Sequence, residues 1–158
     1  MRLGANAGES SLKETVGQAA ALHAASGAPT YVYAFKQLPA GWRREPGCVA
    51  FHGLELSYVF GAIPVGLGSG TTQTLAARGG CSMGVPLHDD EDLRVSDQFA
   101  KVWARFAKTG DPSLAGVADW PRYSEASQTY LNIGAPMEAK QGVENAYVAP
   151  LATAARGF

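Results

Sequence analysis

One histidine, His52, stands where its ring could carry out proton transfer. It follows a stretch of β-branched and aromatic residues, 30–35, by a single loop, and Gly53 comes directly after it. An imidazole on a loop beyond a buried strand can take a proton from a nucleophile and return it to a leaving group. A single histidine is more often structural, so the neighbouring residues have to decide between the two interpretations.

The segment from His52 to Gly61 favours the catalytic interpretation. It reads HGLELSYVFG and resembles the catalytic-histidine motif of type-B carboxylesterases, the family that includes the cholinesterases, whose usual form is H-G-x-[DE]-[LI]-x-[YF]-[VL]-F-G. Three further segments agree with that family in chain order: 27–35, 103–112 and 120–123. The resemblance implies the C-terminal part of an α/β-hydrolase, with His52 as the triad base and a small-molecule carboxylic ester as substrate. Triad chemistry needs no cofactor, and none is expected.

Glu9 is the residue that the resemblance implies as the triad acid. It lies in the segment 3–11, which is similar to the family motif G-x-N-x-D-E-G-S, with Gly8 in place of Asp and Ser10 in place of Gly. Its carboxylate would accept the imidazole N–H and stabilise the imidazolium, and acid before histidine is the α/β-hydrolase order. The alternative is a solvated glutamate near the start of a helix, where a negative charge is favourable.

Two departures from the family pattern bear on activity. His52 follows Glu9 by 43 positions, whereas family members place a much longer helical stretch there, so part of a lid or pocket wall is expected to be missing. In addition, the one match to the G-x-S-x-G pattern in the sequence, Gly80–Gly84, comes after His52, whereas the family carries its serine elbow upstream of the histidine. Ser10 lies in a run that begins like an elbow, but no strand pattern precedes it and no glycine closes it. The nucleophilic serine and its oxyanion hole are therefore expected outside this chain.

The first part of the chain predicts a helix followed by a strand. Ser11 and Glu14 form a capping box. The helix is expected over residues 12–26 and ends at Gly27. The strand, residues 30–35, is apolar on both faces, which is typical of the middle of a parallel sheet. A helix leading into such a strand indicates α/β architecture.

Polar and flexible compositions predict loops in the middle of the chain. Residues 37–48 contain two prolines and two glycines and read as a loop, and residues 61–86 are rich in Gly, Ser and Thr and are expected to be irregular. The acidic run at residues 88–92 is interpreted as a solvated loop, with a metal site as the minor alternative.

The clearest helix follows this acidic run. Ser96 or Asp97 is expected to cap its start, and Gly110 to end it. Its apolar stripe consists of Phe99, Val102, Trp103, Phe106 and Ala107. A short strand is expected over residues 129–133. Since no repeat or domain boundary is found, residues 1–158 are interpreted as one partial α/β domain, an incomplete set of parallel-sheet strands with packed helices.

Composition restricts the partners. Thirteen Lys and Arg against 14 Asp and Glu give a net charge of −1, which disfavours nucleic acid and anionic membranes. No apolar run approaches the roughly 20 residues of a membrane span. The first 13 residues lack the pattern of a signal peptide, so a soluble, cytoplasmic protein is the default expectation.

The two cysteines, Cys48 and Cys81, show no C-x-x-C spacing. They are interpreted as free or buried thiols, because a disulfide would need an oxidising compartment. If the rest of the sheet is missing, the strand at 30–35 would be left with exposed edges, which would favour self-association.

Three functions remain open from the sequence. The first is a carboxylic ester hydrolase present as a partial chain, in which His52 and Glu9 serve a serine supplied from elsewhere. The second is a catalytically inactive carboxylesterase-like remnant or binding module, since a fold does not fix a function. The third is a small self-contained hydrolase that uses Ser10.

Overall fold

The computed structural model describes residues 7–45, 48–51, 53–63, 81 and 88–142, with the backbone alone for residues 7–14. The chain divides into two compact units. The first comprises Met1–Val32, Pro121–Leu131 and Ala139–Phe158, and the second comprises Tyr33–Trp120 and Asn132–Glu138. The single partial domain expected over residues 1–158 stays a prediction.

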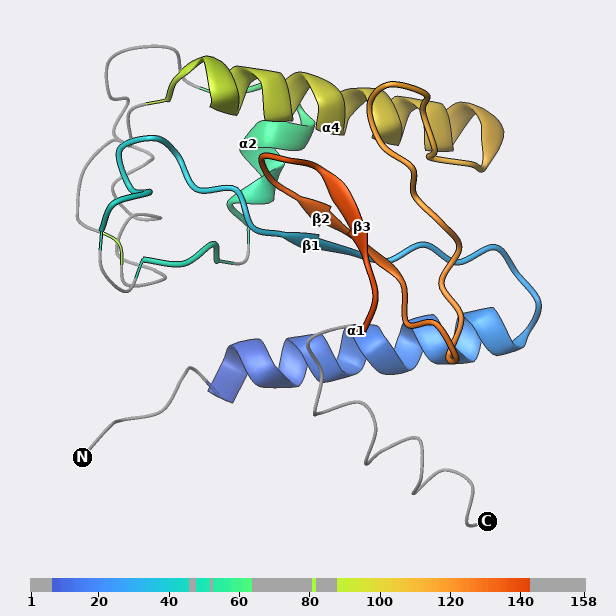
Figure 1. Cartoon of the computed structure of the whole chain (residues 1–158). Coiled ribbons are helices and arrows are strands. Elements are labelled where there is room, and N and C mark those ends of the chain that lie inside the picture. Colours follow the sequence, from blue (N-terminus) through green and yellow to red (C-terminus); the bar gives the residue numbers. More distant parts are fainter. Residues whose placement is uncertain (1–6, 46–47, 52, 64–80, 82–87, 143–158) are drawn as a thin grey trace. The chain divides into compact units, whose positions relative to one another are not determined.

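The first unit contains helix α1, Ala7–Ala25, drawn in blue in Figure 1. The predicted helix is confirmed, but it begins before the expected capping box. Ser11 lies inside the helix, so its assignment as the N-cap is wrong. Once a helix is nucleated, each added residue gains one backbone hydrogen bond, and nothing in Ala7–Ser10 interrupts that propagation. In the last turn of α1, the ring Nδ1 of His23 lies 2.8 Å from the hydroxyl of Thr30. This hydrogen bond connects the end of the helix to the segment that follows it.

A three-stranded sheet has the order β1-β2-β3. Its strands are β1 (Tyr33–Phe35), β2 (Tyr130–Ile133) and β3 (Glu138–Lys140). The Leu131 N–H donates to the Val32 carbonyl (2.9 Å) and the Lys36 N–H donates to the Ile133 carbonyl (2.8 Å), so both strands advance together and β1 and β2 are parallel. The strands predicted at 30–35 and 129–133 are confirmed, with the first of them shorter.

The predicted central position of β1 is wrong within the described residues, because β2 holds the middle of the sheet. The apolar character of β1 has another origin. Tyr33 and Phe35, which share one face of the strand, pack against aromatic rings of helix α4 rather than between two covered sheet faces. The more buried strand is instead β2, where Leu131 and Ile133 have no exposed surface.

Helix α4 spans Asp90–Thr109 and belongs to the second unit. Its end at Gly110, which has a left-handed φ of +75°, is as predicted. Its start is not, because Asp89 caps the helix: its carboxylate accepts from the Asp92 N–H (3.0 Å), and the Asp92 carboxylate accepts from the Asp89 N–H (3.1 Å). The acidic run is therefore a capping box and a first helical turn, and its interpretation as a solvated loop is wrong.

The apolar stripe of α4 is partly confirmed. Phe99 and Val102 are fully buried, whereas Trp103 and Phe106 are 41% and 39% exposed. The ring of Phe99 has its centroid 5.6 Å from that of Tyr33 and 6.0 Å from that of Phe35. This aromatic cluster joins α4 to β1. In the described part of the chain, no helix is both long enough and apolar enough to cross a membrane.

We expect Phe99→Ala to lower the free energy of unfolding by about 3–5 kcal/mol, because it removes a large buried ring and leaves a cavity. Urea unfolding followed by tryptophan fluorescence measures this loss. Phe106→Ala, on the same helix but with its ring 39% exposed, is the control and should lose clearly less. Equal losses for the two variants would contradict the placement of Phe99 at the centre of the second unit.

Candidate active site

The residues on both sides of His52 in the sequence pack into the second unit. His52 itself lies outside the described residues, but its neighbours do not. Phe51 and Leu54 are buried in a small apolar cluster with Trp42, Cys48 and Cys81. Gly53 has a φ of +92°, a conformation that a residue with a side chain rarely adopts, and its N–H donates to the Glu55 carboxylate at 2.9 Å. The backbone therefore makes a sharp turn immediately after His52.

A short helix, α2 (Glu55–Val59), follows this turn and was not predicted. Its Tyr58 is fully buried and is fixed at two points. The Tyr58 hydroxyl donates to Asp92 Oδ1 at 3.0 Å, and the Tyr58 carbonyl accepts from the Ser96 hydroxyl at 2.7 Å. Ser96, expected as a helix cap, is thus an interior residue of α4 that binds α2.

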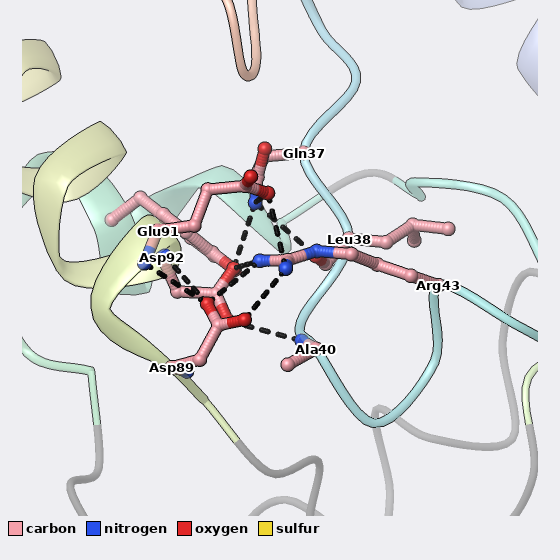
Figure 2. Close-up of polar contacts among 8 residues, drawn as sticks. Gln37, Leu38, Ala40, Arg43, Asp89, Glu91 and Asp92 are labelled. Carbon is pink, nitrogen blue, oxygen red and sulfur yellow. Dashed lines mark hydrogen bonds and ion pairs between the residues drawn. The ribbon is translucent and has the colours of Figure 1, made fainter.

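Asp92 receives hydrogen bonds from three further groups, as Figure 2 shows. The Gln37 amide donates to Oδ1 at 2.8 Å, the Ala40 N–H donates to Oδ2 at 3.0 Å, and the Arg43 guanidinium donates to Oδ1 at 2.6 Å. The Asp92 side chain has no exposed surface. A charge buried to this degree is tolerated only when it is paired and hydrogen-bonded, and this one is both.

Arg43 completes the network on its outer side. It donates two hydrogen bonds to Asp89, at 2.8 and 3.0 Å, and lies 3.0 Å from the Glu91 carboxylate (Figure 2). Burial disfavours the Arg43 cation, but the hydrogen bonds with Asp89 and Asp92 outweigh it and raise the pKa of the guanidinium above its ordinary value. The hydrogen bonds from Arg43 hold the pKa of the Asp89 carboxyl well below its ordinary value.

Tyr58 remains a neutral donor in this network. Burial, followed by the negative charge of Asp92 beside it, raises the pKa of the Tyr58 hydroxyl well above its ordinary value. Its O–H therefore stays available to the Asp92 carboxylate throughout the ordinary pH range.

The sequence signal that could have found this network is the D-x-x-D spacing of Asp89 and Asp92, which matches a capping box.

The two cysteines form a disulfide, so the interpretation of Cys48 and Cys81 as free or buried thiols is wrong. The bridge closes 33 positions of sequence and lies in the apolar cluster that contains Phe51 and Leu54. Both cysteine side chains are buried, as expected, but they are joined by a covalent bond, and their separation in the sequence does not reveal that bond. The disulfide thus holds the chain on the N-terminal side of His52.

Glu9, the predicted triad acid, and Ser10, the nucleophile of the self-contained alternative, belong to the first unit. Glu9 and Ser10 lie in the first turn of α1, and their side chains are outside the described residues. A nucleophilic elbow places its serine on the turn between a strand and a helix, whereas Ser10 is already inside a helix. The pairing of Glu9 with His52 stays a prediction.

A cavity of about 400 Å³ lies elsewhere in the second unit. Its walls come from α4, including Arg94 and Gln98, and from the turn at residues 134–137. No serine, cysteine or histidine is among its lining residues.

The described fold is similar to that of solved esterases. A PNB esterase superposes with a TM-score of 0.54 and 27% identity, over 76% of this chain and 21% of the esterase. Among sequences, carboxylesterase 1E of Mus musculus is 33% identical over 129 residues, which is 80% of this chain and 19% of that protein. Liver carboxylesterase B-1 of Rattus norvegicus is 32% identical over the same coverage. These likenesses confirm the predicted partial α/β-hydrolase fold.

A sequence model of the carboxylesterase family matches residues 2–150, and the chain belongs to that family. The predicted resemblance is thereby confirmed. The chain spans about a fifth of the length of the relatives that it matches.

Removal of the disulfide by Cys48→Ser together with Cys81→Ser should lower the free energy of unfolding by about 3–4 kcal/mol, because the reduced unfolded chain regains the entropy of a 33-residue loop. Urea unfolding of the wild type and of the double variant measures the loss. Dithiothreitol should destabilise the wild type to a similar extent and leave the variant unchanged. Alkylation of both cysteines by iodoacetamide in the native, unreduced protein would contradict the bridge.

The ion pair of Asp89 predicts a pH dependence. Since the folded-state pKa of Asp89 is lowered, its contribution to stability is present above the unfolded value of about 3.9 and is lost as the pH falls toward the folded value. The stability difference between wild type and Asp89→Asn should therefore shrink from about pH 6 to about pH 3, whereas Asp119→Asn, at an exposed position outside the network, should show no such trend. Urea unfolding at each pH tests this, and a difference that grew on acidification would contradict it.

Proposed function

We propose that this chain provides the base and the acid of a serine-esterase triad, and that the reaction is hydrolysis of small-molecule carboxylic esters. The observation that carries the proposal is the family match over residues 2–150, within which His52–Gly61 agrees with the histidine motif at every position. The turn at Gly53 and the anchored helix α2 support it, because a general base has to be held in a fixed orientation.

The proposed roles follow from triad chemistry. His52 accepts the proton of the serine hydroxyl while the serine oxygen attacks the ester carbonyl, and then donates that proton to the leaving alcohol. Water then attacks the acyl-serine: His52 accepts a proton from the water and donates it to the serine oxygen as the acid product leaves. Glu9 accepts the imidazole N–H and stabilises the imidazolium. The serine and the backbone N–H groups of the oxyanion hole come from outside this chain.

The runner-up function is a catalytically inactive relative, and one observation favours it. The 158-residue sequence has no G-x-S-x-G match before His52, where the α/β-hydrolase order requires the elbow, and its one match, Gly80–Gly84, follows the histidine. A His–Glu pair without nucleophile and oxyanion hole would be a poor esterase, since loss of a triad member reduces the rate by on the order of 10⁴-fold or more.

The structure bears on two further expectations, self-association and a cytoplasmic location. Self-association through the sheet stays a prediction, and the edge strand β3 carries Glu138 and Lys140, whose charges oppose pairing with another edge. The Cys48–Cys81 disulfide argues against the cytoplasmic default, because disulfides persist mainly in oxidising compartments.

The proposal predicts that hydrolysis needs both His52 and a serine from a second polypeptide. The chain is assayed on p-nitrophenyl butyrate alone, and then mixed with a PNB-esterase polypeptide that ends before the segment matched by this chain. We expect no enzyme-like turnover by the chain alone and clear turnover by the mixture. His52→Ala should reduce the latter by on the order of 10⁴-fold.

His23→Ala is the matched control, since His23 is an exposed histidine in α1 whose loss should leave turnover unchanged. Turnover that persists in the His52→Ala mixture would exclude His52 as the base. A folded mixture without turnover would instead support the inactive relative. Turnover by the chain alone that is lost on Ser10→Ala would support the self-contained hydrolase.

A further inference from the structure

We infer that Asp92 is a positioning residue for the segment that carries His52. The role rests on the proposed function only where it concerns hydrolysis, because the geometry of the segment can be measured without any substrate. Asp92 lies in the first turn of α4, where it completes the capping box with Asp89, yet its side chain is completely buried and accepts hydrogen bonds from four further groups outside the helix.

The carboxylate joins the two stretches of chain that flank His52 in sequence. On the N-terminal side it accepts from Gln37, Ala40 and Arg43, all in the loop that follows β1. On the C-terminal side it accepts from Tyr58 in α2. One side chain therefore fixes the chain on both sides of His52, and it does so from a long helix whose middle packs against β1 through Phe99.

The network requires a carboxylate and not its amide. Oδ1 accepts from three donors, at 2.8, 2.6 and 3.0 Å, and Oδ2 accepts from the N–H groups of Ala40 and Asp89 at 3.0 and 3.1 Å. In Asp92→Asn, the NH₂ group would face N–H or O–H donors in either orientation of the amide. The substitution keeps the shape of the side chain but places donor against donor, and it leaves Arg43 without its buried counter-charge.

The connection to His52 runs through Tyr58 and the turn before it. The Tyr58 hydroxyl is held by Asp92 and its carbonyl by Ser96, so α2 has a fixed orientation on α4. Glu55, in the first turn of α2, accepts from the N–H of Gly53, the residue after His52. Loss of the Asp92 contacts would free α2 to move, and the His52 imidazole would sample more orientations.

The test observes the His52 ring directly. Long-range ¹H–¹⁵N correlation spectra of the full-length chain report the tautomer and the line widths of each imidazole, with His52→Gln used for assignment. We expect Asp92→Asn to shift or broaden the His52 signals and to increase several-fold the rate at which diethyl pyrocarbonate modifies His52. The signals of His23, in the first unit, should not change. Asp97→Asn, at an exposed position of the same helix, is the matched control and should leave His52 as in the wild type.

A second variant guards against loss of the fold. If Asp92→Asn does not fold, Tyr58→Phe removes only one donor from Asp92 and should change the His52 signals in the same direction to a smaller extent. A folded Asp92→Asn protein, or a folded Tyr58→Phe protein where the first does not fold, with unchanged His52 signals and reactivity would overturn the inference.

The positioning role and the proposed function can fail separately. In the mixture with the PNB-esterase polypeptide, a positioning role predicts that Asp92→Asn lowers kcat and leaves KM unchanged. If the His52 signals respond to Asp92→Asn but no variant or wild type hydrolyses ester, the positioning role stands and the proposed function fails. If ester turnover depends on His52 but neither kcat nor the His52 signals respond to Asp92→Asn, the reverse holds.

Discussion

The ionised carboxylate of Asp92, enclosed on all sides, is the constraint on which the second unit depends. A buried charge is stable only while its hydrogen-bonding capacity is filled, and five donors from the β1–α2 loop, α2 and the helix start fill it here. Each of these segments is short or irregular and has little stability of its own. The carboxylate is the point at which they meet, so its loss would release all of them together.

The buried face of α4 explains how polar and apolar packing are combined. Asp92, Ser96, Phe99 and Val102 are buried and follow one another at intervals of three or four residues, so they lie on one stripe of the helix. The first two bind α2 and the β1–α2 loop through hydrogen bonds, and the last two pack in the apolar interior. The helix thus uses the same face for a polar anchor in its first two turns and an apolar core contact in its middle.

This mixed stripe also shows why the sequence predicted only part of the structure. Phe99 and Val102 gave the helix its apolar period, and Gly110 gave its end, because both signals are local. The sequence pattern places Asp92 in a solvated loop and Ser96 at a helix cap, since hydropathy does not reveal hydrogen-bond partners that come from residues 37–58. The Cys48–Cys81 bridge and helix α2 depend on the same kind of distant partner, and the turn after His52 was recognisable only through the family motif.

The arrangement gives a physical reason for a histidine motif that is intact in a chain with no G-x-S-x-G match before it. The contacts that hold the flanks of His52 all come from Phe35–Phe99 of this chain: the apolar cluster, the disulfide, the Gly53 turn and the Asp92 network. All of these contacts are made within this chain, so none of them needs a serine elbow supplied from outside it. The base of a triad can in general be pre-organised by its own part of a fold, which lowers the entropic cost of assembling the site.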